Sequence, residues 1–222
     1  MAIQEHWLEY EEAWQLLQAE ELPPSDRIRL SPKKHKLVGE SLEGVEHWEL
    51  RLPLPMPQLG EEETLESYVQ RLPDTPPAYL LMLIQMGAAS LGYFEDGEVV
   101  VHKAFKKYMK RHKRGKAQIS YLNTRGKSKA GSRIRLANTV RFAEEINERL
   151  TEWEEWYEPE RIIYSCSAQL WGLLFQSKVP PPFEKKDPRL IKVPMDVKIP
   201  THEELLRVNE FLLKGRLTLS GE

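Results

Sequence analysis

The chain has 222 residues, of which 41% are hydrophobic and 30% are charged, so it can form one or two globular units with a buried core. Its formal net charge is −2, which by itself predicts no polyanionic partner. The single cysteine, Cys166, excludes an internal disulfide and a zinc cluster. The start of the chain lacks a signal-peptide pattern, and the longest apolar run, residues 78–89, is shorter than the ~20 residues that span a bilayer, so we expect a cytoplasmic protein.

The charge is unevenly distributed along the chain. Residues 1–75 contain 7 basic and 16 acidic residues, whereas residues 102–141, called here the basic segment, contain 14 basic residues and no acidic residue. A functional interpretation has to explain this separation.

The first part of the chain predicts a helix followed by two strands. Apolar residues from Trp7 to Leu22 recur at three-, four- and seven-residue spacing among Glu and Gln, which predicts an amphipathic helix that ends at Pro23. We expect its Trp and Leu side chains to pack on the protein's own core rather than on a partner. Apolar and charged residues alternate in residues 27–30 and 46–52, which predicts two short strands around a turn-rich stretch.

A helix is predicted over residues 61–72, because acidic residues cluster at its start, where the helix dipole favours them. The prolines at positions 73, 76 and 77 then mark a boundary. We therefore expect a small acidic α/β subdomain over residues 1–75 and a second domain over residues 76–222.

The second domain begins with three apolar runs at residues 79–86, 88–94 and 98–102, separated by short turns, which predict an antiparallel meander. Residues 103–129 contain few large apolar side chains and predict a helix or extended arm that leads into a loop. Alternating strands and helices then predict an α/β, layered domain with a mixed sheet. The later elements are a helix over 133–156, a strand over 161–165, a short apolar element over 168–175 and a helix over 201–213 with Thr201 as its N-cap.

Several kinds of active site are absent from the sequence. There is no glycine-rich phosphate loop followed by Lys-Ser/Thr, and no nucleophile-elbow serine. The six histidines are scattered without metal-ligand spacing, so we predict no metal and no cofactor. Cys166 is expected to be an inert core residue.

The basic segment is the feature that favours a nucleic-acid partner. Solvated helix faces normally mix both signs, because like charges four residues apart repel by a few tenths of a kcal/mol. A block of cations without a carboxylate indicates that phosphates supply the missing anions, with a solvated face as the alternative. Phe105 and Tyr108 are expected to anchor the segment to the sheet rather than to stack on bases. The candidate RNA-binding residues are Lys103, Lys106, Lys107, Lys110, Arg111, Lys113, Arg114, Lys116, Arg125, Lys127, Lys129, Arg133 and Arg135.

Within the basic segment, Gly115 and Gln118 form a Gly-x-x-Gln string. Gly115 permits backbone conformations that are closed to other residues, and the Gln118 amide both donates and accepts hydrogen bonds. A lone glutamine in a basic loop is usually a solvent-exposed polar residue, so this string alone does not define a site.

Several short segments match a known family in the family's own order. They are Gly92-Tyr93-Phe94, Gly97, Val101-His102-Lys103, Gly115-Lys116-Ala117-Gln118, Ala130-Gly131-Ser132, Asp187-Pro188-Arg189-Leu190 and Pro200-Thr201. From about Tyr79 to the C-terminus, the chain resembles the release-factor domain of the Vms-type family, which includes the ankyrin-repeat and zinc-finger peptidyl-tRNA hydrolase of eukaryotic ribosome quality control. The sequence departs from the family at residues 135–139, which read Arg-Leu-Ala-Asn-Thr where members often have Arg-Arg-Tyr-Asn-Glu. Residues 1–75 lie outside the resemblance.

The resemblance implies a fold related to the middle domain of eukaryotic and archaeal release factors, with Gln118 and Gly115 at the catalytic position. The implied reaction is hydrolysis of the peptidyl-tRNA ester at the peptidyl-transferase centre of stalled ribosomes or large subunits. The implied partners are the ribosome, rRNA and peptidyl-tRNA, for a monomer with no membrane partner. Two alternatives stay open: tRNA cleavage near its CCA end, with His102 and His112 as the nearest acid–base candidates, and binding to the ribosome or tRNA without catalysis.

Overall fold

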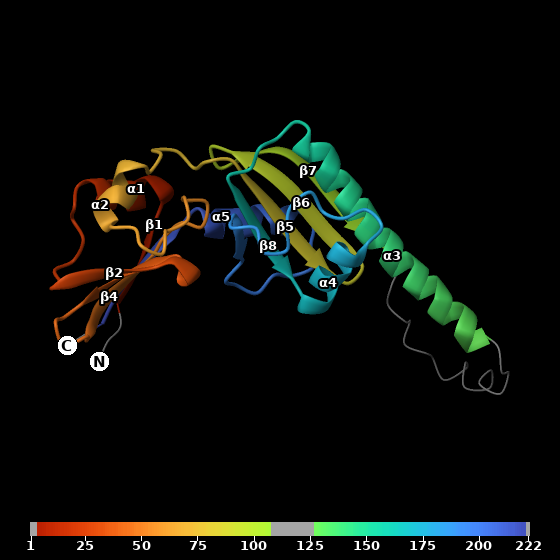
Figure 1. Ribbon diagram of the computed structural model, residues 1–222, viewed down its shortest axis with the longest axis horizontal. Coiled ribbons are helices and arrows are strands. Elements are labelled where there is room, and N and C mark those ends of the chain that lie inside the picture. Colours follow the sequence, from red (N-terminus) through yellow and green to blue (C-terminus); the bar gives the residue numbers. More distant parts are fainter. Residues whose placement is uncertain (1–3, 108–126, 221–222) are drawn as a thin grey trace.

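The computed structural model describes the backbone of residues 4–107 and 127–220, and side chains throughout these ranges except in residues 127–137. The described residues form two five-stranded sheets that lie side by side in an elongated molecule (Figure 1). Helices pack on both sheets, so the predicted α+β layered fold is confirmed.

The first sheet is antiparallel throughout and has the strand order β1-β10-β4-β3-β2. Apolar side chains of its two helices, among them Ala13, Leu17 and Tyr68, form one buried cluster with Trp48 and Leu50 of the sheet. The elements of this N-terminal unit are β1 (Gln4–Leu8), α1 (Tyr10–Gln18), β2 (Arg27–Ser31), the 3-10 turn η1 (Pro32–Lys34), β3 (Lys36–Glu40), β4 (Glu46–Arg51), α2 (Leu65–Gln70) and β10 (Gly215–Leu219).

The predicted helices and strands of this unit are present as α1, β2, β4 and α2, but three details of the prediction were wrong. Trp7 and Leu8 lie in β1 and not in a helix, because β1 pairs with β10, a strand from the other end of the chain. The stretch between β2 and β4 contains a further strand, β3, which pairs with both. The helix expected over residues 61–72 is shorter, since Thr64 caps α2 by accepting a hydrogen bond from Ser67 N at 3.2 Å.

The end of the chain departs from the expected domain division. The sequence assigned all residues from 76 onward to the second domain, but the structure places β10 between β1 and β4 of the first sheet. Without β10, β1 has no neighbour in that sheet. The chain therefore leaves the N-terminal unit once and returns to complete it.

The second sheet is mixed and has the order β7-β6-β5-β8-β9. The predicted meander is confirmed, since β5–β6 and β6–β7 pair antiparallel, whereas β8 runs parallel to β5 and β9 parallel to β8. The elements are β5 (Tyr79–Gln85), β6 (Ala88–Glu95), β7 (Glu98–Lys106), α3 (Lys127–Glu154), β8 (Arg161–Cys166), α4 (Ala168–Gln176), β9 (Leu190–Lys192) and α5 (His202–Leu212).

Both faces of the second sheet are buried, which explains why β5 is an uninterrupted apolar run. Leu80, Met82 and Ile84 point toward α3 and α4, whereas the alternate residues, such as Leu81 and Leu83, point toward α5. Figure 1 shows α3 crossing one face and its N-terminal end projecting beyond the sheet. None of the described helices is long and apolar enough to cross a membrane.

Candidate RNA-binding and catalytic segment

Residues 108–126, which include Gly115 and Gln118, lie outside the described residues. The structure fixes the two ends of this part of the chain: β7 ends at Lys106 and α3 begins at Lys127. The Lys107 N–H donates to the Gly87 carbonyl oxygen at 2.9 Å, so the chain leaves the sheet beside the β5–β6 turn. The Gly-x-x-Gln string is thus inserted between an edge strand and a long projecting helix.

The candidate RNA-binding residues fall into three groups. Lys103 and Lys106 are exposed on β7, which extends further than the predicted 98–102 and makes the start of the basic segment an edge strand. Lys107 follows the strand. Four others belong to α3 by their backbone: Lys127, Lys129, Arg133 and Arg135. The remaining six lie outside the described residues: Lys110, Arg111, Lys113, Arg114, Lys116 and Arg125.

Two contacts attach the start of the basic segment to the body of the protein. The Phe105 side chain packs against the core between the sheet and α3, as predicted. The Lys107 ammonium group forms an ion pair with the Glu145 carboxylate of α3 at 2.5 Å. Glu145 was missed by the sequence interpretation, because a carboxylate 38 positions away gives no local signal. These contacts define the direction in which the chain leaves β7.

His102, the candidate acid–base group for tRNA cleavage, lies on β7 next to His202, the first residue of α5. Their ring centroids are 3.9 Å apart and the rings are stacked. Burial and the neighbouring His202 lower the pKa of His102, which favours its neutral form. Nδ1 of His202 is buried without a hydrogen-bond partner among the described residues. His112, the second candidate, lies outside the described residues, so its position relative to His102 is not tested.

The Gly92 and Gly97 motif positions serve the packing of α5. A Cβ atom on Gly92 would lie 2.7 Å from both the Leu205 side chain and the Phe94 ring, so only glycine allows α5 to approach this closely. Gly97 has a φ of +81° in the turn between β6 and β7, and its carbonyl oxygen accepts a hydrogen bond from Asn209 Nδ2 at 2.9 Å. Both glycines therefore contribute to the scaffold rather than to a site.

The later motifs also stabilise the scaffold. Arg189 donates two side-chain hydrogen bonds to Asp187, at 3.0 and 2.7 Å, and a third to the Pro159 carbonyl oxygen at 3.2 Å. This arrangement holds the chain just before β9 and lowers the pKa of Asp187. Thr201 caps α5 as predicted, while Glu204 accepts hydrogen bonds from Arg207 and from Lys198 N.

Other potential sites in the described residues show no catalytic arrangement. Cys166 is buried, and burial raises the pKa of its thiol to about 12, which agrees with an inert core residue. In the described ranges, no group of three or more His, Cys, Asp or Glu side chains has the geometry to hold a metal ion.

Two layered α+β units, with the basic segment leaving the edge strand of one of them, form a fold that this chain shares with proteins of the release-factor class, as two comparisons show. A solved structure described as the Vms1 mitochondrial localization core has this fold: it aligns with a TM-score of 0.50 and 12% identity, covering 96% of this chain and 82% of that one. The family model described as Bacteroidetes VLRF1 release factor, bVLRF1, matches residues 79–219. The chain belongs to this family, which confirms the Vms-type resemblance.

The curated relatives extend the similarity into the N-terminal unit. The protein called tRNA endonuclease ANKZF1 is 28% identical to this chain over 203 residues in both Mus musculus and Homo sapiens, which is 85% of this chain in each case. The Caenorhabditis elegans protein called tRNA endonuclease vms-1 is 25% identical over 122 residues, or 54% of this chain. The chain spans only about a quarter of the length of the two mammalian relatives, 27% and 28%.

Proposed function

We propose that this protein is a ribosome-associated release factor that hydrolyses the peptidyl-tRNA ester on stalled ribosomes or large subunits. The observation that carries the proposal is the release-factor family match over residues 79–219, which spans the insertion between β7 and α3 and hence the Gly-x-x-Gln string. This position supports a role for the string as a tip that enters a partner's active site.

The proposed reaction needs no strong base from this chain. A water oxygen attacks the ester carbonyl carbon, the bond to the tRNA 3′ oxygen breaks, and a proton passes to that oxygen as the free tRNA leaves. The Gln118 amide orients the water and donates a hydrogen bond near the developing negative charge, so it acts by positioning and electrostatics. The peptidyl-transferase centre supplies most of the remaining site.

The second candidate function is cleavage of the tRNA near its CCA end, which is favoured because the relatives from mouse, human and Caenorhabditis elegans are called tRNA endonucleases. Phosphodiester cleavage calls for acid and base groups. The lowered pKa of His102 leaves it neutral near pH 7, as a general base requires. His202 stacks on His102 and is a second imidazole beside it, so both histidines belong to this hypothesis.

The experiment is a single-turnover reaction with large subunits that carry labelled peptidyl-tRNA. We expect released peptide and a tRNA with an intact CCA end, and we expect Gln118→Ala to lower the rate about a hundredfold without loss of binding. Gln176→Ala, an exposed glutamine at the end of α4, is the matched control and should react at the wild-type rate.

The products separate the hypotheses. A truncated tRNA 3′ end that depends on His102 would establish the nuclease instead of the hydrolase. An unchanged release rate in Gln118→Ala would remove that residue from the catalytic role. If the protein binds the large subunits but yields neither product, it is a factor that acts by binding alone.

A further inference from the structure

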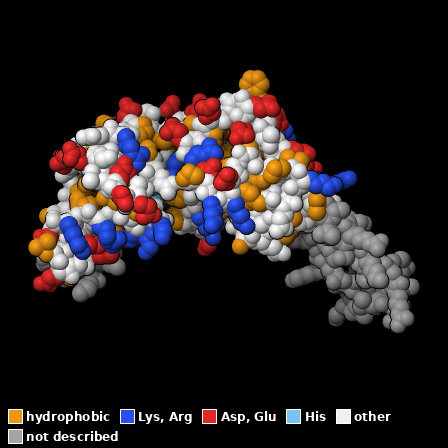
Figure 2. All heavy atoms as spheres, viewed as in Figure 1, with side chains coloured by type: hydrophobic (Ala, Val, Ile, Leu, Met, Phe, Trp, Pro, Cys, Tyr) orange, Lys and Arg blue, Asp and Glu red, His pale blue; other side chains and the backbone are white. Residues whose placement is uncertain are grey.

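A second concentration of positive charge lies in the acidic N-terminal unit. Residues 27–36 contain five of the seven basic residues found in residues 1–75, and no acidic residue. They form β2, the η1 turn and the start of β3. In Figure 2, Lys and Arg side chains gather along the lower edge of this unit, where Figure 1 places β2 and β4.

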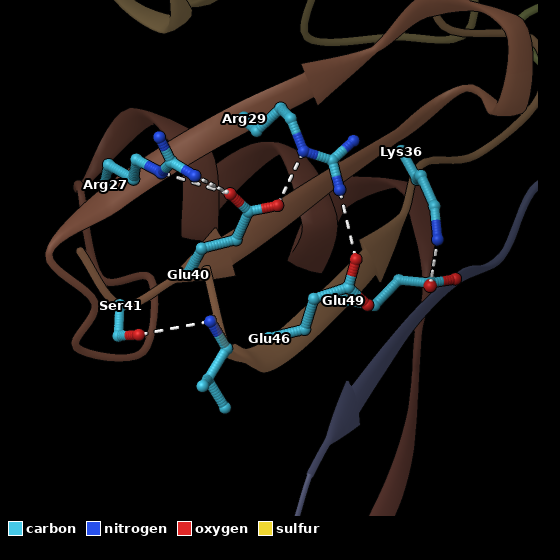
Figure 3. Close-up of polar contacts among 8 residues, drawn as sticks. Arg27, Arg29, Lys36, Glu40, Ser41, Glu46 and Glu49 are labelled. Carbon is cyan, nitrogen blue, oxygen red and sulfur yellow. Dashed lines mark hydrogen bonds and ion pairs between the residues drawn. The ribbon is translucent and has the colours of Figure 1, made fainter. Parts of the chain in front are cut away.

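Three of the five cations are neutralised within the sheet (Figure 3). Arg27 and Arg29 both contact the Glu40 carboxylate, at 2.8 and 2.6 Å, and Arg29 also pairs with Glu46 at 3.0 Å. Lys36 pairs with Glu49. The hydrogen bond from Arg29 lowers the pKa of Glu40, so this carboxylate stays charged.

The other two cations, Lys33 and Lys34, have no carboxylate within 4 Å among the described residues, and both side chains are exposed. The charged edge strand β2 is a common protection against edge-to-edge pairing, which accounts for Arg27 and Arg29. Lys33 and Lys34 lie beyond that strand, on η1, so edge protection does not account for them.

The turn that carries the two lysines is fixed to the core. His35, the residue that ends η1, is fully buried with a φ of 50°, and its Nε2 lies 3.1 Å from the Pro53 carbonyl oxygen. The backbone N–H and C=O groups of His35 are both hydrogen-bonded. His35 N donates to the Pro32 carbonyl oxygen at 3.2 Å, and Leu52 N donates to the His35 carbonyl oxygen at 3.1 Å. The backbone that carries the two lysines is therefore fixed before a ligand binds, which lowers the entropic cost of binding an anion.

The side of the molecule on which β2 and β4 lie suits contact with a large polyanion. In Figure 1, β2 and β4 lie on the lower side of the molecule at one end, and the N-terminal end of α3 points to the same side at the other end. An RNA surface that met the basic segment from that side would also approach the N-terminal unit.

We propose that the η1 turn is a second RNA contact, in which Lys33 and Lys34 bind backbone phosphates of the ribosomal partner and Arg27 and Arg29 add partly neutralised charge on the same hairpin. The contact would be sequence-independent, because lysines on a turn offer charge and no base-reading geometry. This inference rests on the ribosome binding in the proposed function, and it gives a role to the N-terminal unit.

The test compares Lys33→Glu/Lys34→Glu with Lys185→Glu/Lys186→Glu in equilibrium binding to purified large ribosomal subunits. The control pair is also exposed and adjacent, and it makes the same change in net charge, but acidic residues flank it at positions 184 and 187. Loss of two phosphate contacts should weaken binding roughly 30-fold at 0.1 M salt and reduce the salt exponent by about two. The control should bind as the wild type does.

Each outcome decides the inference separately from the proposed reaction. Equal affinities of the two double variants, or no binding of the wild-type protein, would overturn the second contact. If the wild type binds but releases no peptide, the proposed reaction fails, and the affinity ratio of the variants still decides the contact. Unfolding midpoints equal to that of the wild type verify that both variants are folded.

Discussion

Most cations of the N-terminal unit have internal partners, with Lys33 and Lys34 as the exceptions, whereas most described cations of the basic segment have none. In the N-terminal unit, Arg27, Arg29, Lys36 and Arg71 form ion pairs, while the Arg51 guanidinium lies 4.5 Å from the centroid of the Phe211 ring and 5.5 Å from that of Trp7. Of the basic-segment cations whose side chains are described, Lys107 alone has an ion pair. Cations with internal partners hold the fold together, and those without them are available to a ligand.

Charge reversal in the part of the basic segment that lies outside the described residues gives the largest expected effect. The variant Lys110→Glu/Arg111→Glu/Lys113→Glu/Arg114→Glu should bind large subunits about a thousandfold more weakly at 0.1 M salt, because about four phosphate contacts are lost. Its thermal unfolding should match that of the wild type. If binding survived the reversal and did not depend on salt, the RNA-binding surface would lie elsewhere. The contrast between the two sets of cations would then be wrong.

The next largest expected effect is a dependence of stability on pH, caused by the buried His35 of the N-terminal unit. Burial lowers the pKa of His35 from 6.5 to about 3, and the positive charge of Arg161 adds to the decrease. The unfolded chain therefore takes up a proton first as the pH falls, so stability is complete above about pH 6.5 and decreases progressively toward pH 3. Between pH 7 and pH 4.5 this histidine alone should lower the free energy of unfolding by about 2–3 kcal/mol.

Urea unfolding at the two pH values measures this loss. His35→Asn is the comparison variant, because asparagine tolerates the left-handed backbone at this position and does not titrate. The variant should be less stable at pH 7 but should lose less stability on acidification. An identical loss in both proteins would show that His35 is protonated in the folded state, contrary to its burial.

The sequence predicted the second unit better than the first, for physical reasons. The meander, the helix capped by Thr201 and the inert Cys166 depend on local patterns that the sequence displays. The structure of the N-terminal unit depends on β10, which pairs with β1 across nearly the whole chain, and no local pattern reveals such a partner. The candidate site followed from charge and motif order, whereas the Glu145 and His202 contacts arise only when distant elements pack together.

The smallest expected effect concerns Lys107, which belongs to the basic segment but forms an ion pair, as most cations of the N-terminal unit do. Its side chain is only 23% exposed and that of Glu145 is 43% exposed, so the ion pair should contribute at most about 1 kcal/mol to folding. Glu145→Gln removes the internal partner and frees Lys107 for one further phosphate. We expect stability to change by less than about 1 kcal/mol, and affinity for large subunits to rise up to about sixfold.

Glu152→Gln is the matched control for this variant. Glu152 lies on the same helix and also forms an ion pair, with Arg149 at 2.7 Å, but Arg149 lies outside the basic segment. Both substitutions remove one negative charge from α3, so any long-range electrostatic gain is common to the two. A higher affinity in Glu145→Gln alone would mean that pairing, and not position in the sequence, decides whether a cation of this protein binds RNA. Equal affinities of the two variants for large subunits would mean that Lys107 stabilises the fold and does not bind RNA.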